Sequence, residues 1–220
     1  MGINIAIDGP AGAGKSTIAK KVAKELSFIY VDTGAMYRAM AFYLLEKGIS
    51  GDENISKACH DADISIRYEN GEQQVILNGK NVTAFLRKEE VGNMASVSSA
   101  NPEVRAHLLK LQRNLAAENN VVMDGRDIGT TILPNAEVKI FLTASAKTRA
   151  NRRYLELTEK GEACDMDEIL KDIIDRDERD MSRAVSPLKQ AEDAVLVDSS
   201  EMGIEEVVEN ILSVYRKKVN

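Results

Sequence analysis

The residues with the clearest chemical potential lie near the start of the chain, where a glycine-rich stretch ends in a lysine and two hydroxyl residues. Residues 9–17 read Gly-Pro-Ala-Gly-Ala-Gly-Lys-Ser-Thr, which fits the P-loop pattern G-x-x-x-x-G-K-S. Glycines let successive backbone N–H groups point at phosphate oxygens, and the helix that follows adds its N-terminal dipole. Lys15 can then bridge the β- and γ-phosphates, and the Ser16 hydroxyl can bind Mg²⁺. The stretch predicts a nucleoside triphosphate site at Gly9, Pro10, Ala11, Gly12, Ala13, Gly14, Lys15, Ser16 and Thr17.

The segments on either side of this stretch are those that a P-loop needs. Residues 3–7 form a short apolar run with β-branched residues, which is typical of a buried strand. Ile18, Val22 and Leu26 recur at helical spacing within residues 15–27. A chance glycine-rich turn does not require a strand before it and an amphipathic helix after it. The context therefore favours nucleotide binding.

A second group of candidate residues lies where other predicted strands end. In open α/β sheets, ligands bind outside the carboxyl ends of the strands. Asp124 follows the apolar residues 121–123 at such an end, and we expect its carboxylate to hold Mg²⁺ through a water molecule. The alternative is an ordinary Asp-Gly turn. Asp8, at the end of the first strand, is a weaker candidate for the same ion.

Two predicted helices carry arginines at spacings that place them on one face. The two sets are Arg149, Arg152 and Arg153, and Arg176, Asp180 and Arg183. A solvated helix stabilised by ion pairs would show similar spacing, with Asp172, Asp175 and Asp177 as partners. However, a triphosphate and an acceptor phosphate need several cations, and a guanidinium group holds two phosphate oxygens at once. A site rich in arginine with no obvious nucleophile is what phosphoryl transfer requires.

The rest of the chain alternates between predicted strands and helices. We expect further strands at residues 28–32, 121–127, 138–143 and 194–198, and helices at 35–47, 102–118, 146–160, 167–183 and 204–218. Residues 63–87 differ, because two alternating runs, 64–69 and 72–78, are joined by Asn70-Gly71, the strongest short-range hairpin signal. The pattern predicts an α/β fold of the P-loop NTPase type: a parallel five-stranded sheet flanked by helices, with a small inserted antiparallel β subdomain.

The composition argues against several other classes of protein. The chain has 220 residues, of which 44% are apolar, and this suffices for a sizeable core. Its net charge of −6 argues against a surface that coats nucleic acid. Cys59 and Cys164 show no zinc or disulfide spacing, and the isolated His60 and His107 are expected to be structural. No leader precedes the first strand and no apolar run is long enough to span a membrane, so we expect a cytoplasmic monomer without nucleic-acid or membrane partners.

Four sequence blocks together resemble the signature blocks of bacterial cytidylate kinases. They are residues 9–17, residues 32–38 (Asp-Thr-Gly-Ala-Met-Tyr-Arg), residues 124–130 (Asp-Gly-Arg-Asp-Ile-Gly-Thr) and residues 179–184 (Arg-Asp-Met-Ser-Arg-Ala). The resemblance covers residues 2–215 and includes Leu77-Asn78-Gly79 and Val91-Gly92-Asn93 of the inserted segment. Many NTPases share the P-loop, whereas the four blocks in this order are highly specific.

This resemblance implies a role for each candidate residue. Residues that would read the cytosine edge, whose exocyclic amine needs an acceptor, are Ser96, Arg105 and Asp127. Residues that would hold the acceptor phosphate are Thr33, Arg38, Arg126 and Arg183, with Arg176 and Asp180 near the sugar hydroxyls. A mobile lid over ATP would carry Arg149, Arg152 and Arg153. The catalytic cations would be Lys15, Arg126, Arg153 and Arg183.

The resemblance also implies a reaction and a division of the chain. The reaction would be transfer of the γ-phosphoryl group of ATP to CMP or dCMP, with Mg²⁺, giving ADP and CDP or dCDP. We expect a core of residues 1–62 and 119–220, an inserted monophosphate-binding subdomain at 63–118 and a short helical lid at 146–166. One alternative is a P-loop kinase for UMP or for a metabolite such as shikimate. Another is a GTP-binding switch, although no Asn-Lys-x-Asp guanine motif precedes residues 144–147. A nucleic-acid-binding module is opposed by the acidic balance and the low aromatic content.

Overall fold

The computed structural model describes residues 2–219, and within them the chain forms two compact units. The sheet unit consists of residues 3–30 together with the chain from residue 120 onward, and the hairpin unit consists of Val31–Asn119. The hairpin unit begins earlier than the insertion expected at 63–118. The reason is that helix α2 (Thr33–Glu46) packs on other helices and strands of the hairpin unit.

A five-stranded parallel sheet organises the sheet unit and confirms the predicted fold class. Its order is β2-β6-β1-β7-β8, and its strands are β1 (Asn4–Asp8), β2 (Ile29–Asp32), β6 (Val121–Gly125), β7 (Val138–Thr143) and β8 (Val195–Asp198). In the central position, β1 pairs in parallel with β6 and β7, so that Ile7 lies opposite Asp124 on one side and Ile140 on the other. β6 ends two residues before its predicted end, and the chain then forms the single π-helical turn η3 (Ile128–Ile132).

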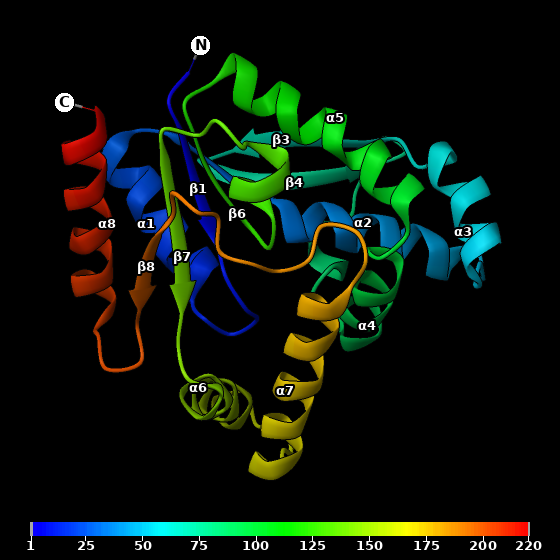
Figure 1. Ribbon diagram of the computed structural model, residues 1–220. Helices are drawn as coiled ribbons and strands as arrows, with labels where there is room; N and C mark the ends of the chain where they lie inside the picture. The colour runs from blue at the N-terminus through cyan, green and yellow to red at the C-terminus, as the bar shows by residue number, and fades with distance from the viewer. Residues whose placement is uncertain (1, 220) are drawn as a thin grey trace. The chain divides into compact units, whose positions relative to one another are not determined.

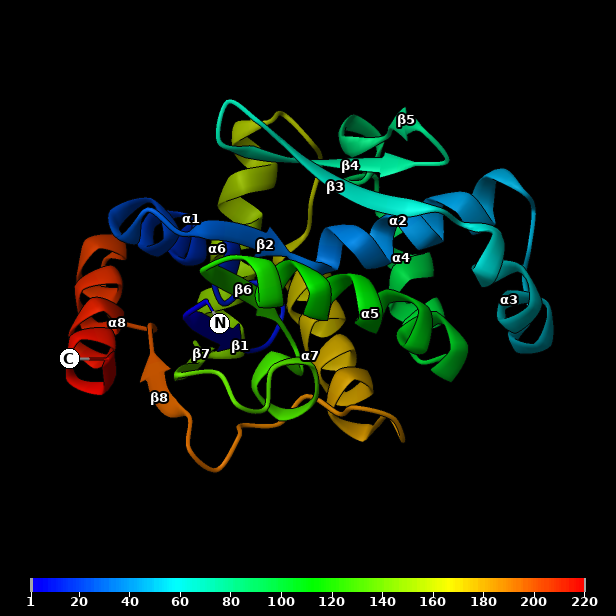
Figure 2. The same ribbon diagram turned by 90° about the horizontal axis from the view of Figure 1, so that it is seen from above.

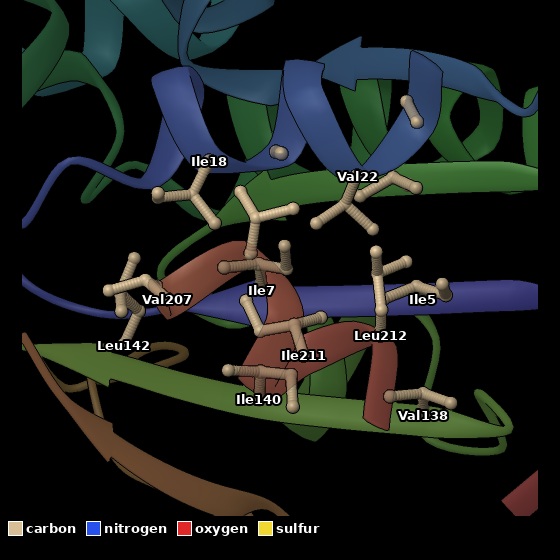
Figure 3. Close-up of a cluster of buried hydrophobic side chains, with 14 of the residues drawn as sticks. Ile5, Ile7, Ile18, Val22, Val138, Ile140, Leu142, Val207, Ile211 and Leu212 are labelled. Atoms are coloured by element: carbon tan, nitrogen blue, oxygen red, sulfur yellow. The ribbon is translucent and has the colours of Figure 1, made fainter. Parts of the chain in front are cut away.

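Helices α1 (Lys15–Leu26) and α8 (Ile204–Val219) cover one face of this sheet. Figure 3 shows Ile18 and Val22 of α1 and Ile211 of α8 packed around Ile5 and Ile7 of β1. Burying one such side chain contributes about 1.5–3 kcal/mol, so this core fixes the strand to which the P-loop is attached. The apolar stripe predicted for residues 15–27 is the buried face of α1.

Helices α6 (Ala146–Glu159) and α7 (Met166–Ser182) contact each other beyond the carboxyl end of β7 (Figure 1). Both begin at side-chain caps, where the Ser145 hydroxyl accepts from the N–H of Thr148 and the Asp165 carboxylate accepts from Asp167 and Glu168. The two arginine-bearing helices therefore lie at the end of the sheet where ligands are expected.

The hairpin unit contains a three-stranded antiparallel sheet of β3 (Ile64–Glu69), β4 (Glu72–Leu77) and β5 (Lys80–Asn81). The predicted hairpin is confirmed, and Asn70 and Gly71 both have positive φ, as a tight two-residue turn requires. The other elements are α3 (Asp52–Ala58), η1 (Cys59–Asp61), η2 (Thr83–Phe85), α4 (Glu89–Ser98) and α5 (Pro102–Glu118). Helix α2 contacts β3, β4, α4 and α5 (Figure 2).

The two histidines, which look isolated in the sequence, lie together in the hairpin unit. Their ring centroids are 5.8 Å apart, and Nε2 of His107 is 2.9 Å from the carbonyl oxygen of Ala62. Cys59 and Cys164 are free thiols. Within residues 2–219, every helix is too short or too polar to cross a lipid bilayer.

Candidate active site

The P-loop joins β1 to α1, and its backbone requires glycine at two positions. Gly9 has a φ of 151°, and a Cβ atom there would lie 1.9 Å from the carbonyl oxygen of Leu142 in β7. Gly14, the N-cap of α1, has a φ of 87° in the left-handed region. The glycines therefore allow the loop to pass close to β7 and to turn directly into the helix.

Lys15 lies buried at the start of α1, and its Nζ donates a hydrogen bond of 2.8 Å to the carbonyl oxygen of Pro10. Burial and the charge of Arg126 lower the pKa of the Lys15 ammonium from 10.5 to about 7, and Arg176 acts in the same direction. The carboxylates of Asp124 and Asp8 oppose this shift. Three cationic side chains are thus close enough to repel one another at the P-loop. An anionic ligand bound there would reduce this repulsion.

Ser16 and Asp124 form the oxygen-rich part of the site. The Ser16 hydroxyl donates to one oxygen of the buried Asp124 carboxylate at 2.9 Å, and the Tyr30 hydroxyl donates to the other at 3.0 Å. Hydroxyl and carboxylate oxygens are the ligands that Mg²⁺ prefers, so the predicted pair fits this ion. Among the described residues no group of three or more His, Cys, Asp or Glu could hold a metal, so Mg²⁺ here would need substrate and water oxygens as well.

Tyr30 was not identified from the sequence. It lies buried on β2, which neighbours β6 in the sheet. The sequence feature that could have indicated its role is a tyrosine within a predicted apolar strand. A buried tyrosine hydroxyl usually has a hydrogen-bond partner. Tyr30 therefore orients the Asp124 carboxylate.

The three arginines of α6 do not share one environment, although their spacing places them on one helix face. Arg149 is buried and donates to the carbonyl oxygens of Ala144 and Ala11 at 2.9 Å each. It also forms a two-pronged ion pair with Asp177 of α7, at 3.1 and 2.5 Å. Arg149 thus links the P-loop, α6 and α7.

The other two α6 arginines differ from Arg149 and from each other. Arg152 donates to the carbonyl oxygen of Ser199 at 2.7 Å, and its Nη1 would lie 3.9 Å from a Cβ atom on Gly14. Arg153 is exposed and pairs with Glu156 at 3.1 Å. Arg152 therefore lies beside the P-loop, whereas Arg153 lies on the solvent-exposed surface of the helix.

Replacing Arg149 by methionine is expected to lower the free energy of unfolding by about 3–5 kcal/mol, because it leaves the largely buried Asp177 carboxylate without its cation. Urea unfolding measures this loss. The matched control is Arg153→Met on the same helix, which breaks an exposed pair and should cost less than about 1 kcal/mol. Equal losses for the two variants would contradict the structural role of Arg149.

The loop after β6 meets the carboxyl-terminal part of α7. Nε of Arg126 donates to Asp180 at 2.9 Å, and Nη2 of Arg183 lies 3.7 Å from the Asp127 carboxylate. Nε of Arg183 also donates to the carbonyl oxygen of Ser186 at 2.6 Å. Two arginines that the resemblance assigns to the acceptor phosphate are therefore each paired with a carboxylate that it assigns to the sugar or to the base.

Asp8 does not serve the site as the sequence suggested. Its two carboxylate oxygens accept hydrogen bonds of 2.7 Å each from the backbone N–H groups of Ile128 and Gly129. Both oxygens are thus engaged by the η3 turn, and the weaker assignment of Asp8 as a metal ligand is not supported. Burial raises the pKa of this carboxyl from 3.8 to about 6, with a further contribution from Asp127, while the two backbone bonds and Lys15 act against the shift.

This raised pKa predicts a specific pH dependence of stability. A carboxyl that binds its proton more tightly when folded stabilises the fold below pH 4, and this contribution is lost as the pH rises through about 6. The free energy of unfolding of the wild type, relative to that of Asp8→Asn, should therefore fall by about 2–3 kcal/mol between pH 4 and pH 7. Urea unfolding of both proteins across this range measures the difference. A difference that rises with pH would contradict the assignment.

In the hairpin unit, the start of α2 brings the predicted residues Thr33 and Arg38 together. The Asp32 carboxylate caps the helix by accepting from the N–H of Ala35 at 2.9 Å, and Thr33 is buried next to it. A Cβ atom on Gly34 would lie 3.3 Å from Nη1 of Arg38, so this guanidinium lies beside the first turn. The start of a helix together with an arginine suits a phosphate.

The backbone of this turn is held by Gln73 of β4, which sequence reasoning missed. Its side-chain oxygen accepts from the N–H of Asp32 at 2.8 Å, and its amide nitrogen donates to the Asp32 carbonyl oxygen at 3.2 Å. Arg105 of α5 is buried, donates to the carbonyl oxygen of Ser99 at 3.2 Å and lies over the ring of Tyr37 at 5.4 Å. This bond brings Arg105 into contact with the end of α4. Ser96 is half-buried on α4, one turn before Ser99.

Comparisons with known proteins cover nearly the whole chain. Residues 5–217 match the family model described as cytidylate kinase. The chain belongs to the cytidylate kinase family. A cytidylate kinase of Caldicellulosiruptor bescii is 50% identical over 219 residues, which are 99% of this chain and 97% of that protein. A cytidylate kinase of Carboxydothermus hydrogenoformans is 50% identical over 218 residues, with 98% of each chain covered.

Among solved structures, an uncharacterized protein of Eubacterium ventriosum aligns with a TM-score of 0.50 at 15% identity, with 96% of each chain covered. This similarity concerns the fold alone. Family membership is therefore established by sequence.

Proposed function

We propose that this protein transfers the γ-phosphoryl group of ATP to CMP or dCMP. The observation that carries the proposal is the group of cations at the P-loop, where Lys15 is close enough to Arg126 and Arg176 for their charges to lower its pKa. Membership of the cytidylate kinase family supports the choice of CMP and dCMP as acceptors.

We assign the donor side of the reaction to residues of the sheet unit. The P-loop amides and Lys15 bind the β- and γ-phosphates of ATP, and Arg152 beside Gly14 is a further candidate for these phosphates. Arg149 keeps the loop in shape through its bond to Ala11. Arg153 is a candidate for the transferred phosphoryl group, because its exposed pair with Glu156 is weak and easily exchanged for a phosphate.

The resemblance to cytidylate kinases suggests residues for the acceptor side of the reaction. Candidates for the monophosphate are Thr33, Arg38, Arg126 and Arg183, and candidates for the sugar are Arg176 and Asp180. Ser96, Arg105 and Asp127 are our candidates for the cytosine edge. The carboxylate of Asp127 suits the exocyclic amine of cytosine, whereas uracil has a carbonyl oxygen in its place.

In the proposed mechanism an oxygen of the acceptor phosphate attacks the γ-phosphorus in line. This oxygen is already anionic at neutral pH, so the protein supplies no general base. Arg126 and Arg183 hold the acceptor oxygen and spread the charge of the transition state, while Lys15 neutralises the leaving side. Mg²⁺, held by Ser16 and by Asp124 through water, would neutralise the phosphates of ATP when bound.

We also propose that the protein acts as a cytoplasmic monomer, since every residue assigned above to the donor or the acceptor comes from a single copy of the chain. Size-exclusion chromatography with light scattering tests the oligomeric state. A stable dimer at micromolar concentration would contradict this part of the proposal.

A coupled ADP-release assay tests the reaction itself, with ATP and Mg²⁺ and with CMP, dCMP, UMP, AMP and GMP in parallel. We expect rapid turnover with CMP and dCMP alone. Strong activity with UMP would contradict the assignment of Ser96, Arg105 and Asp127. Silence with every monophosphate would overturn the proposed function.

A further inference from the structure

A side chain of β1 binds the turn that follows β6. Both oxygens of the Asp8 carboxylate accept hydrogen bonds from η3, one from Ile128 and one from Gly129. These are the first two residues of the π-helical turn, whose own backbone bonds start only at the N–H of Thr131, which donates to Asp127. Asp8 thus binds the two amides that the turn itself leaves without an acceptor.

A second side chain closes the other side of this turn. A Cβ atom on Gly129 would lie 3.2 Å from Cδ of Lys139 and 3.3 Å from Oδ2 of Asp8. Lys139 cannot easily move away, because its Nζ bonds both oxygens of Asp193, at 2.8 and 2.9 Å, and the carbonyl oxygen of Pro134. The turn is therefore held between the side chains of Asp8 on β1 and Lys139 on β7.

Asp8 lies next to the P-loop in the sequence, and the turn that it binds lies next to two candidate site residues. Asp8 is directly followed by Gly9, the first residue of the P-loop, and Ile128 is directly preceded by Arg126-Asp127. The carboxylate is buried, with 4% of its residue surface exposed, so solvent does not weaken the two bonds. One side chain therefore joins the loop assigned to ATP and the loop assigned to the acceptor.

We propose that Asp8 is a positioning residue that fixes Arg126 and Asp127 relative to the P-loop through the backbone of Ile128 and Gly129. The expected effect on catalysis rests on the proposed function. The contact between Asp8 and the turn can be tested without measuring enzymatic activity. Asparagine at position 8 keeps the size of the side chain and offers only one acceptor, since its NH₂ group would face an N–H group.

The first test is amide hydrogen exchange in Asp8→Asn, followed by NMR. We expect the amides of Ile128 and Gly129 to exchange at least about tenfold faster than in the wild type, while those of Val122 and Ile140 in the sheet stay unchanged. The matched control is Glu137→Gln, whose side chain accepts from the N–H of Asn4 at 2.8 Å in an exposed place. This control should leave the amides of Ile128 and Gly129 as they are.

The second test compares the two substrates in the same variant. Asp8→Asn should raise KM for CMP about tenfold while the dissociation constant for ATP changes less than about twofold. Gly129→Ala provides an independent route, because the added methyl group crowds Lys139 and Asp8 without removing the carboxylate. It should change the same two quantities in the same direction.

The outcomes separate the contact from the reaction. Unchanged exchange at Ile128 and Gly129 in Asp8→Asn, or equal weakening of CMP and ATP in both variants, would overturn the positioning role. If Asp8→Asn does not fold, Gly129→Ala decides by the same criteria. A wild type that is inactive on CMP would refute the proposed function, and the exchange experiment would still decide whether Asp8 holds the turn.

Discussion

Replacing Arg183 by alanine is expected to lower kcat/KM for CMP by about 10³-fold, the scale on which a catalytic arginine acts in phosphoryl transfer. Arg183 lies at the end of α7, with its side chain nearly buried and its Nη2 3.7 Å from the Asp127 carboxylate. The bond from its Nε to Ser186 holds the guanidinium in place before any substrate arrives. Preorganised positive charge of this kind stabilises the transition state at little cost of reorganisation. Steady-state kinetics with ATP and CMP measure the effect.

Two further variants show whether the loss comes from the guanidinium group itself. Arg183→Lys keeps the charge and loses the two-pronged geometry, so its activity should lie between those of the wild type and the alanine variant. Arg179→Ala, one turn earlier on the same helix, removes an exposed arginine whose Nε donates to the carbonyl oxygen of Asp175. Its activity should stay within about twofold of the wild type. Full activity of Arg183→Ala would place Arg183 among the structural residues of α7.

Replacing Asp127 by alanine is expected to lower kcat/KM for CMP by about 100-fold and to leave the dissociation constant for ATP within about threefold. The residue is 3% exposed and lies two positions after the end of β6, directly before η3, so its carboxylate is held in a buried turn. A buried acceptor that matches the amine of cytosine discriminates strongly, because the wrong base leaves polar groups without partners. Isothermal titration with ATP and kinetics with CMP measure the two quantities. Equal losses for both nucleotides would refute a role in reading the base.

The Asp127→Asn variant sharpens this test. An amide can donate to the carbonyl oxygen of uracil, whereas it accepts less strongly than a carboxylate from the amine of cytosine. The ratio of kcat/KM for CMP to that for UMP should fall by about tenfold or more. An unchanged ratio would mean that Asp127 positions its neighbours without contacting the base.

Local patterns account for most of the fold that could be predicted. Asn70-Gly71 between two alternating runs defined the hairpin, and the bounds of β7 and α5 agree with their predicted ranges. The P-loop was identified because its spacing is tied to a backbone shape that only certain residues allow. Helix α3 escaped prediction because it is short and buries one residue, Ile55, which gives no periodic signal.

Contacts between distant parts of the chain account for what the sequence did not reveal. Asp8 and Arg149 are charged residues next to recognised motifs, yet their partners are backbone groups whose positions depend on the folded chain. Gln73 and Tyr30 likewise bond to Asp32 and Asp124, which are distant from them in the sequence. Equal spacing also concealed that Arg149 is buried while Arg153 is exposed. Residue type and spacing indicate a helix face, but burial decides which charge is structural.

The transfer of a labelled phosphoryl group tests the central claim most directly. The protein is incubated with ATP labelled at the γ-phosphorus, Mg²⁺ and CMP, and the products are separated by chromatography. The proposed reaction predicts that the label appears in the β-phosphate of CDP, in amounts equal to the ADP formed, and that Arg183→Ala slows its appearance by about 10³-fold. Label that appears only as inorganic phosphate, or that stays in ATP, would contradict the claim that this protein phosphorylates CMP.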